Sequence, residues 1–256
     1  MDYMNVGFIG TGEIAEALIE GITGQGHKIY VSNRSNLRSQ RLSEEYSEVI
    51  ACENDEVCSS SDIIFICLMA SVARDILPKL NFRTDHQIVS VMAHINRDEL
   101  KSYCLPAKNV CITIPLPFVA KGGCPLPVYP HSDALKVLYG ANNSIIVLES
   151  ADHIAPHFVI SAMLSPVFFL FDMASKWLGS KTGNDLQSEI YLTHLFKGYL
   201  DFMPDSERER FAAALHSLST EGGLNSTLRA HMEEKGTYSA LSDGLALLEK
   251  RLGIKS

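Results

Sequence analysis

The sequence lacks the features of a nucleic-acid-binding, disulfide-linked or metal-binding protein. Its 256 residues carry a formal net charge of −8, so there is no basic surplus to neutralise nucleic-acid phosphates. The six cysteines form neither CxxC pairs nor a spacing typical of metal ligands. Cys67 lies inside an apolar run, which is typical of a reduced core cysteine in a cytoplasmic protein. A functional thiol is the alternative for Cys124, which lies between Gly123 and Pro125.

The sequence also lacks a long apolar run and internal repeats, and we expect no targeting segment. No basic start precedes the first apolar run, and a glycine turn interrupts that run, so we expect no signal peptide. The most apolar later stretch, residues 158–171, has about fourteen residues with a proline among them, which is too short to span a bilayer. With 46% hydrophobic and 20% charged residues, the composition is that of a soluble globular protein. These observations predict a cytoplasmic protein without a membrane partner.

What the sequence does contain, near its start, is a short apolar strand followed by a glycine turn and a helix. Gly10 permits the tight turn, Gly12 leaves room for a pyrophosphate beside the backbone, and Ala15 is a small residue where the helix packs on the strand. The N–H groups at the start of the helix then face the anion. A plain strand-to-helix turn without a ligand is the alternative. The residues predicted to bind a dinucleotide here are Gly10, Thr11, Gly12, Glu13 and Ile14.

The residues after the second predicted strand indicate which dinucleotide binds. Ser32, Asn33 and Arg34 follow this strand, where a site for NAD would hold an acidic residue against the ribose. An arginine with neighbouring hydroxyl and amide groups suits a 2′-phosphate instead. NADP is therefore the predicted cofactor and NAD the less favoured one. A solvated loop arginine is the alternative interpretation of Arg34.

The first 150 residues alternate short β-branched runs with helical stretches. This pattern predicts an α/β fold of the Rossmann type, with a doubly wound, mostly parallel sheet and a ligand at the carboxyl ends of its strands. Leu68 and Met69 follow the fourth strand and Ala93 follows the fifth, so we expect these residues to border the nicotinamide half of the cofactor. His94, beside them, is either a proton donor or a capping or surface residue. The strands are predicted at residues 5–9, 28–31, 48–51, 62–68, 87–92, 109–114 and 144–148.

A segment rich in proline and glycine follows the sixth predicted strand. Residues 114–127 hold four of the ten prolines of the chain and the pair Gly122-Gly123. Such a segment is extended and stiff. It is either a wall of the substrate pocket or a crossover to the edge of the sheet.

Strand patterns disappear after residue 150, and long helical stretches take their place. We therefore expect a dinucleotide-binding domain at 1–150 and a helical domain for dimerisation and substrate binding at 151–256. Predicted helices around Phe168 and Ile190 are apolar on more than one face. A helical domain of about a hundred residues cannot bury so much apolar surface alone, so we expect a homodimer or a larger assembly of this chain. The helices are predicted at residues 152–163, 166–178, 184–202, 205–218, 224–234 and 238–252.

One segment of the helical half carries further chemistry. Hydroxyl groups, a glycine pair and the start of a helix follow one another at residues 219–225. Successive backbone N–H groups in such a segment form a nest that can hold a carboxylate. A simple helix cap by Ser219 or Thr220 is the alternative. The residues predicted to bind the substrate are Gly222, Gly223 and Leu224.

Taken together, these motifs resemble the pyrroline-5-carboxylate reductase family over nearly the whole chain. Most specific is the segment 220–225, which with the residues after it is similar to the Ser-Pro-Gly-Gly-x-Thr loop and the following helix pair of that family. The resemblance implies an NADPH-linked, proline-forming reduction of a cyclic imine at an interlocked dimer interface. The other segments that carry it are 6–15, 32–35, 89–93, 165–168 and 236–241.

Two positions depart from the family pattern. Asn225 replaces the family threonine, and an asparagine amide donates a hydrogen bond but is no acid near neutral pH. Residues 115–117 read Pro-Leu-Pro where the family has Asn-Thr-Pro. The predicted function is an NADPH-dependent reductase of a small carboxylated cyclic imine, with Thr220 and Asn225 as the catalytic residues that orient the reacting nitrogen. A reductase of another imine or keto acid, or a non-catalytic NADPH-binding sensor, is the alternative.

Overall fold

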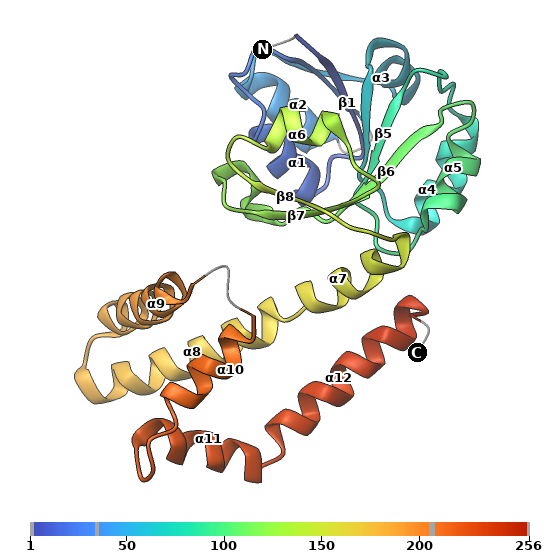
Figure 1. Ribbon diagram of the computed structural model, residues 1–256. Helices are drawn as coiled ribbons and strands as arrows, with labels where there is room; N and C mark the ends of the chain where they lie inside the picture. Colours follow the sequence, from blue (N-terminus) through green and yellow to red (C-terminus); the bar gives the residue numbers. More distant parts are fainter. Residues whose placement is uncertain (1–2, 34–35, 205–207, 255–256) are drawn as a thin grey trace. The chain divides into compact units, whose positions relative to one another are not determined.

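The computed structural model describes residues 3–33, 36–204 and 208–254, and they form two compact units. The first unit comprises the described residues up to Phe158 and those from Leu252 onward, and the second comprises Val159–Arg251. All strands lie in the first unit, and the second consists of helices (Figure 1).

The first unit contains one sheet of eight strands in the order β3-β2-β1-β4-β5-β6-β7-β8. Neighbouring strands are parallel except for β6 and β7, which are antiparallel. Strand order reverses between β1 and β4, and in such sheets the ligand crevice opens at the carboxyl ends beside that reversal. This arrangement confirms the predicted fold class. The strands are β1 (Asn5–Ile9), β2 (Lys28–Ser32), β3 (Val49–Cys52), β4 (Ile63–Ile66), β5 (Gln87–Ser90), β6 (Asn109–Thr113), β7 (Pro125–Tyr129) and β8 (Ser144–Val147).

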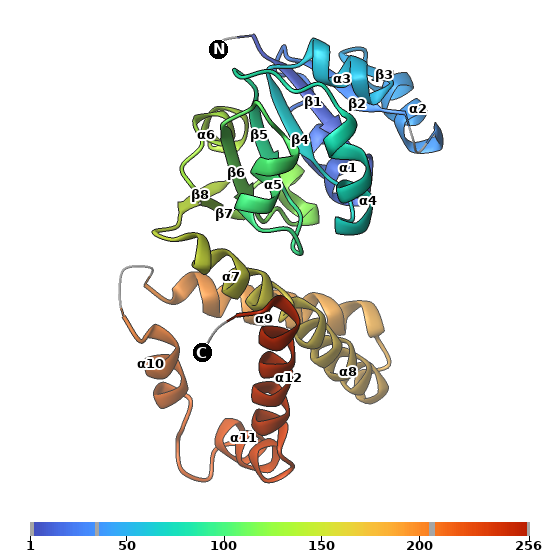
Figure 2. The ribbon, with the colours of Figure 1, turned by 90° about the vertical axis from the view of Figure 1, so that its right-hand side faces the viewer.

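Helices cover both faces of the sheet (Figure 2). Successive side chains of a strand point to opposite faces, so Ile63 and Phe65 of β4 join one hydrophobic cluster while Ile64 and Ile66 join another. The first cluster packs against α1 (Glu13–Glu20), α2 (Asn36–Glu45) and α6 (Asp133–Tyr139), and the second against α3 (Asn54–Ser60), α4 (Ala70–Ile76) and α5 (Arg97–Tyr103). Short 3-10 helices lie at η1 (Leu77–Lys79), η2 (Pro117–Lys121) and η3 (Ala151–His153).

The strand β7 is absent from the sequence prediction, and it bears on the crossover interpretation of residues 114–127, while a wall of the substrate pocket stays a prediction. This segment forms η2 and then returns as β7, antiparallel to β6, so it is the crossover toward the edge of the sheet. Prolines hide the strand pattern because they cannot donate to a ladder. Pro125 and Pro127 are two residues apart and therefore place their missing donors on the same side, while Leu126 and Val128 are fully buried.

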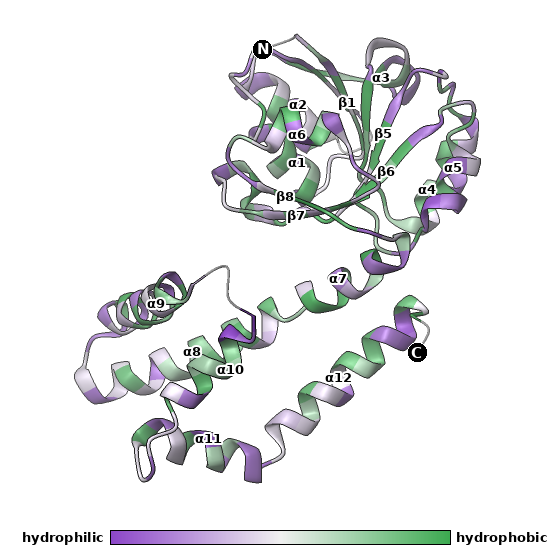
Figure 3. Ribbon diagram, in the orientation of Figure 1, coloured by the Kyte–Doolittle hydropathy of each residue, from purple (hydrophilic) through white to green (hydrophobic). Residues whose placement is uncertain are grey.

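The second unit exposes many large apolar side chains. α8 and α9 pack against each other through Phe171 and Phe196, whose ring centroids are 4.5 Å apart. Phe168, Phe169 and Trp177 of α8 nevertheless remain 62%, 64% and 63% exposed, and Figure 3 shows hydrophobic segments along both helices. The helices are α7 (Ile154–Ser161), which crosses the division between the units, α8 (Leu164–Thr182), α9 (Asp185–Phe202), α10 (Arg210–Ser217), α11 (Leu224–Glu234) and α12 (Thr237–Leu252). The predicted start of the fourth helix at Asp205 lies outside the described residues.

The expectation that the most apolar run is too short to cross a membrane needs correction. Residues Ala151–Thr182 form one helical stretch of 32 residues, which by length and composition alone is long and apolar enough to do so. The most apolar 18 residues of this stretch have a mean hydropathy of 1.9, and 11% of these residues are buried. Pro166 does not end the helix because it lies in the first turn of α8, where a proline is tolerated.

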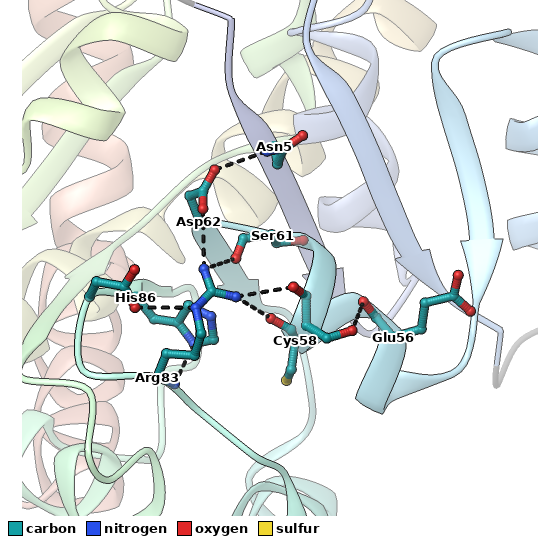
Figure 4. Close-up of polar contacts among 9 residues, drawn as sticks. Asn5, Glu56, Cys58, Ser61, Asp62, Arg83 and His86 are labelled. Atoms are coloured by element: carbon teal, nitrogen blue, oxygen red, sulfur yellow. Dashed lines mark hydrogen bonds and ion pairs between the residues drawn. The ribbon is translucent and has the colours of Figure 1, made fainter.

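A cluster of hydrogen bonds around Arg83 joins the amino ends of three strands (Figure 4). The Arg83 guanidinium donates to the carbonyl oxygens of Cys58, Ser59 and Ser61 at 3.0–3.2 Å, and to the Asp62 carboxylate at 3.2 Å. The Arg83 N–H donates to Nδ1 of His86 at 3.0 Å, and burial lowers the pKa of this histidine. Arg83 therefore satisfies the last carbonyls of α3, at the amino ends of central strands, away from the carboxyl ends where the ligand crevice opens.

Candidate functional site

The glycine turn after β1 lies directly against the end of β4. Gly10 has a φ of +98°, and a Cβ atom there would lie 2.3 Å from the carbonyl oxygen of Cys67. The Cys67 N–H donates to the Ile9 carbonyl at 2.9 Å, which ties the two strand ends together. Only glycine fits position 10, because both the backbone angle and the space exclude a side chain.

Gly12 leaves the amino end of α1 uncovered. It is the N-cap of that helix, with φ −78° and ψ −178°, and no side chain caps the helix. A Cβ atom at Gly12 would meet nothing within 4 Å. Thr11, beside it, is 6% exposed, and its Oγ1 has no hydrogen-bond partner among the described residues. This arrangement fits the pyrophosphate of a dinucleotide. The uncapped amides of α1 can donate to it, the space beside Gly12 can hold it, and the Thr11 hydroxyl can bond to it.

Ser32 shapes this turn from the neighbouring strand. The Gly10 N–H donates to Ser32 Oγ at 2.8 Å, and Ser32 is 2% exposed. Ser32 therefore holds the turn from behind through an acceptor site, and its predicted role in cofactor binding stays a prediction. Asn33 is half-buried, its N–H donates to the Cys52 carbonyl, and its Oδ1 accepts from Ser39 Oγ at 3.3 Å. Arg34 lies outside the described residues, so its predicted role stays a prediction.

Two arginines of α2 that the sequence interpretation missed lie near the turn. Glu16 of α1 forms ion pairs with both Arg38 and Arg41. Arg38 Nη1 also donates to the Thr11 carbonyl at 3.5 Å. The signal in the sequence is their spacing of three residues, which places both arginines on one face of a predicted helix.

The predicted residues at the nicotinamide end follow β4 and β5. Leu68 lies beside the glycine turn. A Cβ atom added at Gly10 would be only 2.9 Å from Cδ2 of Leu68. Met69 is 76% exposed and is the N-cap of α4, which no side chain caps. Ala93 and His94 are exposed in the loop before α5, where the carbonyl of His94 accepts from Arg74 at 3.4 Å. These residues lie at the carboxyl ends of neighbouring strands, as predicted.

The cysteines are reduced core residues, as predicted, and Cys124 is no reactive thiol. All six are free. Cys124 is fully buried, burial raises its pKa, and its Sγ donates to the Pro125 carbonyl at 3.5 Å. A buried thiol with a raised pKa is inert near neutral pH. Among the described residues no cluster of histidine, cysteine and carboxylate side chains fits a metal ion.

The second predicted site lies in the second unit, between α10 and α11. Gly222 has a φ of +68°, and Gly223 is the N-cap of α11, which no side chain caps. The Gly223 N–H is not available to a ligand, because it donates to the Thr220 carbonyl at 3.0 Å. This corrects its predicted role as a carboxylate donor. The amides offered by this turn are therefore those of Gly222, Leu224, Asn225 and Ser226, because the Thr227 N–H donates to the Gly223 carbonyl at 3.0 Å.

Ser226, which the sequence interpretation missed, holds this loop in shape. Its Oγ lies 2.8 Å from the carbonyl oxygens of both Thr220 and Gly223, so its single proton is shared between these two acceptors. Leu224 is 91% exposed, and Asn225 is also exposed in the first turn of α11. A serine three residues after Gly223 was the available signal, since serine hydroxyls often bond nearby carbonyls.

Comparison with known proteins finds sequence similarity over part of the chain. Residues 5–94 match the family described as NADP oxidoreductase, coenzyme F420-dependent. Pyrroline-5-carboxylate reductase of Corynebacterium melassecola is 28% identical over 46% of this chain and 47% of its own length. Pyrroline-5-carboxylate reductase 2 of Bacillus subtilis is 31% identical over 38% of this chain and 37% of its own length. The matched region thus spans less than half the length of these curated relatives.

Solved structures match nearly the whole chain at low identity. Pyrroline-5-carboxylate reductase of Streptococcus pyogenes gives a TM-score of 0.82 at 14% identity, over 98% of both chains. The Plasmodium falciparum enzyme, solved with NADP bound, gives 0.82 at 14% identity over 99% of this chain and 98% of its own. A reductive aminase of Aspergillus terreus, in complex with NADPH4, cyclohexanone and allyl amine, gives 0.62 at 13% identity over 99% and 88%. The resemblance to pyrroline-5-carboxylate reductases is confirmed: the chain shares sequence with them over less than half of its length, and it shares their fold.

Proposed function

We propose that this protein is an NADPH-dependent reductase of the pyrroline-5-carboxylate reductase type, acting on a small carboxylated cyclic imine. The observation that carries this proposal is the uncapped amino end of α1, with Gly12 open to solvent and the buried Thr11 hydroxyl without a partner in the described part of the chain. It lies where the strand order reverses, which is the usual position of a dinucleotide. The NADP bound to the Plasmodium falciparum relative supports the choice of cofactor.

In this proposal the first unit binds and orients the cofactor. The amides of α1 and the Thr11 hydroxyl hold the pyrophosphate, and the absence of a side chain at Gly12 lets it approach. Leu68, Met69 and Ala93 border the nicotinamide end, and Arg34 contributes to binding of the 2′-phosphate. NADPH, when bound, supplies the hydride, so the chain has to provide placement and a site that excludes water.

The second unit supplies the groups that hold the substrate. The Gly222 N–H and the first amides of α11 bind its carboxylate, because uncapped helix amides favour an anion. Asn225 and Thr220 orient the ring nitrogen. An imine that arrives protonated needs little acid catalysis, so an amide at position 225 can serve where an acid cannot.

A wider imine or keto acid specificity is the second candidate. The Aspergillus terreus structures show that reductive aminases and an imine reductase share this fold, and fold does not fix the substrate. A non-catalytic NADPH sensor is the third candidate, and it leaves the glycine nest of the second unit without a role.

The substrate test is a panel of imines and keto acids, with NADPH oxidation as the readout. We expect the highest kcat/KM with pyrroline-5-carboxylate. Asn225→Ala should lower kcat about tenfold, the loss of roughly one oriented hydrogen bond, and should leave the Kd for NADPH unchanged. Asn225→Thr is the matched variant that restores the family residue and should retain activity.

Each outcome of this test has a defined meaning. Best turnover with an uncharged imine or a keto acid replaces the proposed substrate. No turnover on any compound, together with tight NADPH binding, favours the sensor. An unaltered kcat in Asn225→Ala removes that residue from the site.

We also propose that a second copy of this chain covers the apolar helices of the second unit. α8 and α9 expose aromatic side chains such as Phe168, Trp177 and Tyr191, more than a monomer leaves in water. Both helices are exposed in this way, so the apolar surface is not limited to the long stretch Ala151–Thr182. Analytical ultracentrifugation without detergent should give a dimer or larger assembly. A monomer in buffer, or a requirement for lipid or detergent, would contradict this proposal.

A further inference from the structure

The loop between β5 and α5 presents His94 between two buried anchors. Met92 and Ile95 are 4% and 2% exposed, while His94 is exposed. Because β4 is the one strand between β1 and β5, the carboxyl end of β5 lies about 10 Å from that of β1, where the glycine turn begins. His94 therefore lies on the ligand side of the sheet, at the nicotinamide end of the proposed cofactor site.

This loop holds its shape without the imidazole of His94. Arg74 Nη2 donates to the backbone carbonyl of His94 at 3.4 Å, and Arg74 Nε pairs with Glu99 of α5 at 2.8 Å. The N-cap of α5 is Asn96, whose Oδ1 accepts from the Glu99 N–H at 2.9 Å. Asn96, and not His94, is thus the capping residue, and no described residue bonds to the imidazole. The fold positions His94 but makes no use of its side chain.

The residues that follow the neighbouring strands cannot supply a proton near neutral pH. Leu68 and Met69 after β4 are apolar, and burial raises the pKa of the Cys67 thiol well above its ordinary value. The residues after β6 are Ile114, Pro115 and Leu116. Histidine is the side chain that most often gives or takes a proton near neutral pH. Among the described residues that directly follow β4, β5 and β6, His94 alone has this chemistry.

We infer that His94 is a catalytic residue that gives the proton to the imine nitrogen during reduction. This inference rests on the proposed function, because it concerns the substrate of the same site. A neutral imine takes the proton of the His94 imidazolium through the nitrogen lone pair, forming the N–H bond. The imine carbon then accepts the hydride, and the electron pair of the C=N π bond becomes the lone pair of the product amine. The imidazole is left neutral and regains its proton from water, to which it is exposed.

The kinetic test compares two substrates, a carboxylated cyclic imine and its N-methyl iminium analogue, which carries a permanent charge and needs no proton. We expect His94→Gln to lower kcat on the imine about 100-fold, the loss of a general acid. The same variant should reduce the iminium analogue at nearly the wild-type rate. His131→Gln is the matched control, because His131 is an exposed histidine that follows the antiparallel strand β7. It should keep both rates within about twofold of the wild type.

A binding test needs no turnover. Tetrahydrofuran-2-carboxylate has a ring oxygen that accepts a hydrogen bond, whereas cyclopentanecarboxylate has nearly the same shape and no ring acceptor. Calorimetry on the full chain with NADP added should show that the wild type prefers the first ligand. His94→Phe, which has no donor, should lower the ratio of the two affinities about fivefold. His94→Gln keeps a donor, so its ratio should lie between those of His94→Phe and the wild type.

The outcomes separate this inference from the proposed function. An equal fall of both rates in His94→Gln overturns the inference, because a proton donor is not needed for the iminium. An unchanged imine rate in His94→Gln, or an unchanged ligand ratio in His94→Phe, also overturns it and leaves the reductase proposal standing. A wild type that reduces neither compound and does not bind NADPH overturns the proposed function and this inference with it.

Discussion

Gly12→Ser is expected to keep or raise the melting temperature while lowering the affinity for NADPH about 100-fold. Gly12 has the extended backbone of an N-cap, with φ −78° and ψ −178°. Serine is a favoured residue in that conformation, because its hydroxyl accepts from the first helix amides. The same hydroxyl would occupy the donors and the open space that the proposed pyrophosphate site requires. Stability and binding should therefore change in opposite directions.

Two measurements check this expectation, thermal unfolding and NADPH titration by fluorescence. Gly10→Ala is the informative comparison, because its φ of +98° and the Cys67 carbonyl 2.3 Å from the added Cβ should lower the melting temperature. If Gly12→Ser binds NADPH as tightly as the wild type, the amino end of α1 is not the pyrophosphate site. The same result would remove the main support for the reductase proposal.

Arg83→Met is expected to lower the free energy of unfolding by about 2–4 kcal/mol. Methionine keeps the apolar stem of the side chain and removes every guanidinium donor. The carbonyls of Cys58, Ser59 and Ser61 would then lose the donor they now share, at the end of α3. Urea unfolding of the two proteins at neutral pH measures the difference.

Asp85→Asn is the control for this prediction. The Asp85 carboxylate pairs with Arg83 Nε at 3.2 Å, but its side chain is 72% exposed, so its loss should not be measurable. Arg83→Lys should behave almost like Arg83→Met, because one ammonium group cannot reach the same set of acceptors. If Arg83→Lys retains the wild-type stability, charge alone matters and the fork geometry does not. If Arg83→Met is as stable as the wild type, the cluster does not stabilise the fold.

Most strands of the sheet were predictable because local patterns determine them. The glycine turn with its flanking strand and helix, and buried runs such as Ile63–Ile66, need no knowledge of distant residues. β7 was not predictable, because its prolines remove the pattern and only pairing with β6 and β8 makes it a strand. The hydrogen bonds from Gly10 N–H to Ser32 Oγ and from Gly223 N–H to the Thr220 carbonyl were not predictable either. A sequence motif shows which donors and acceptors are present, but it does not show which of them already bond to each other.

The sequence by itself determined the Rossmann-type sheet, the glycine turn, the reduced state of the cysteines and the helical second half. These follow from periodicity, from glycine stereochemistry and from burial of apolar residues, all of which act locally. Only the tertiary structure decided that Ser32 shapes the turn, that Arg38 and Glu16 lie beside Thr11, and that Arg83 joins α3 to the sheet. Those contacts link residues 20 or more positions apart, and their geometry depends on how the helices pack on the sheet.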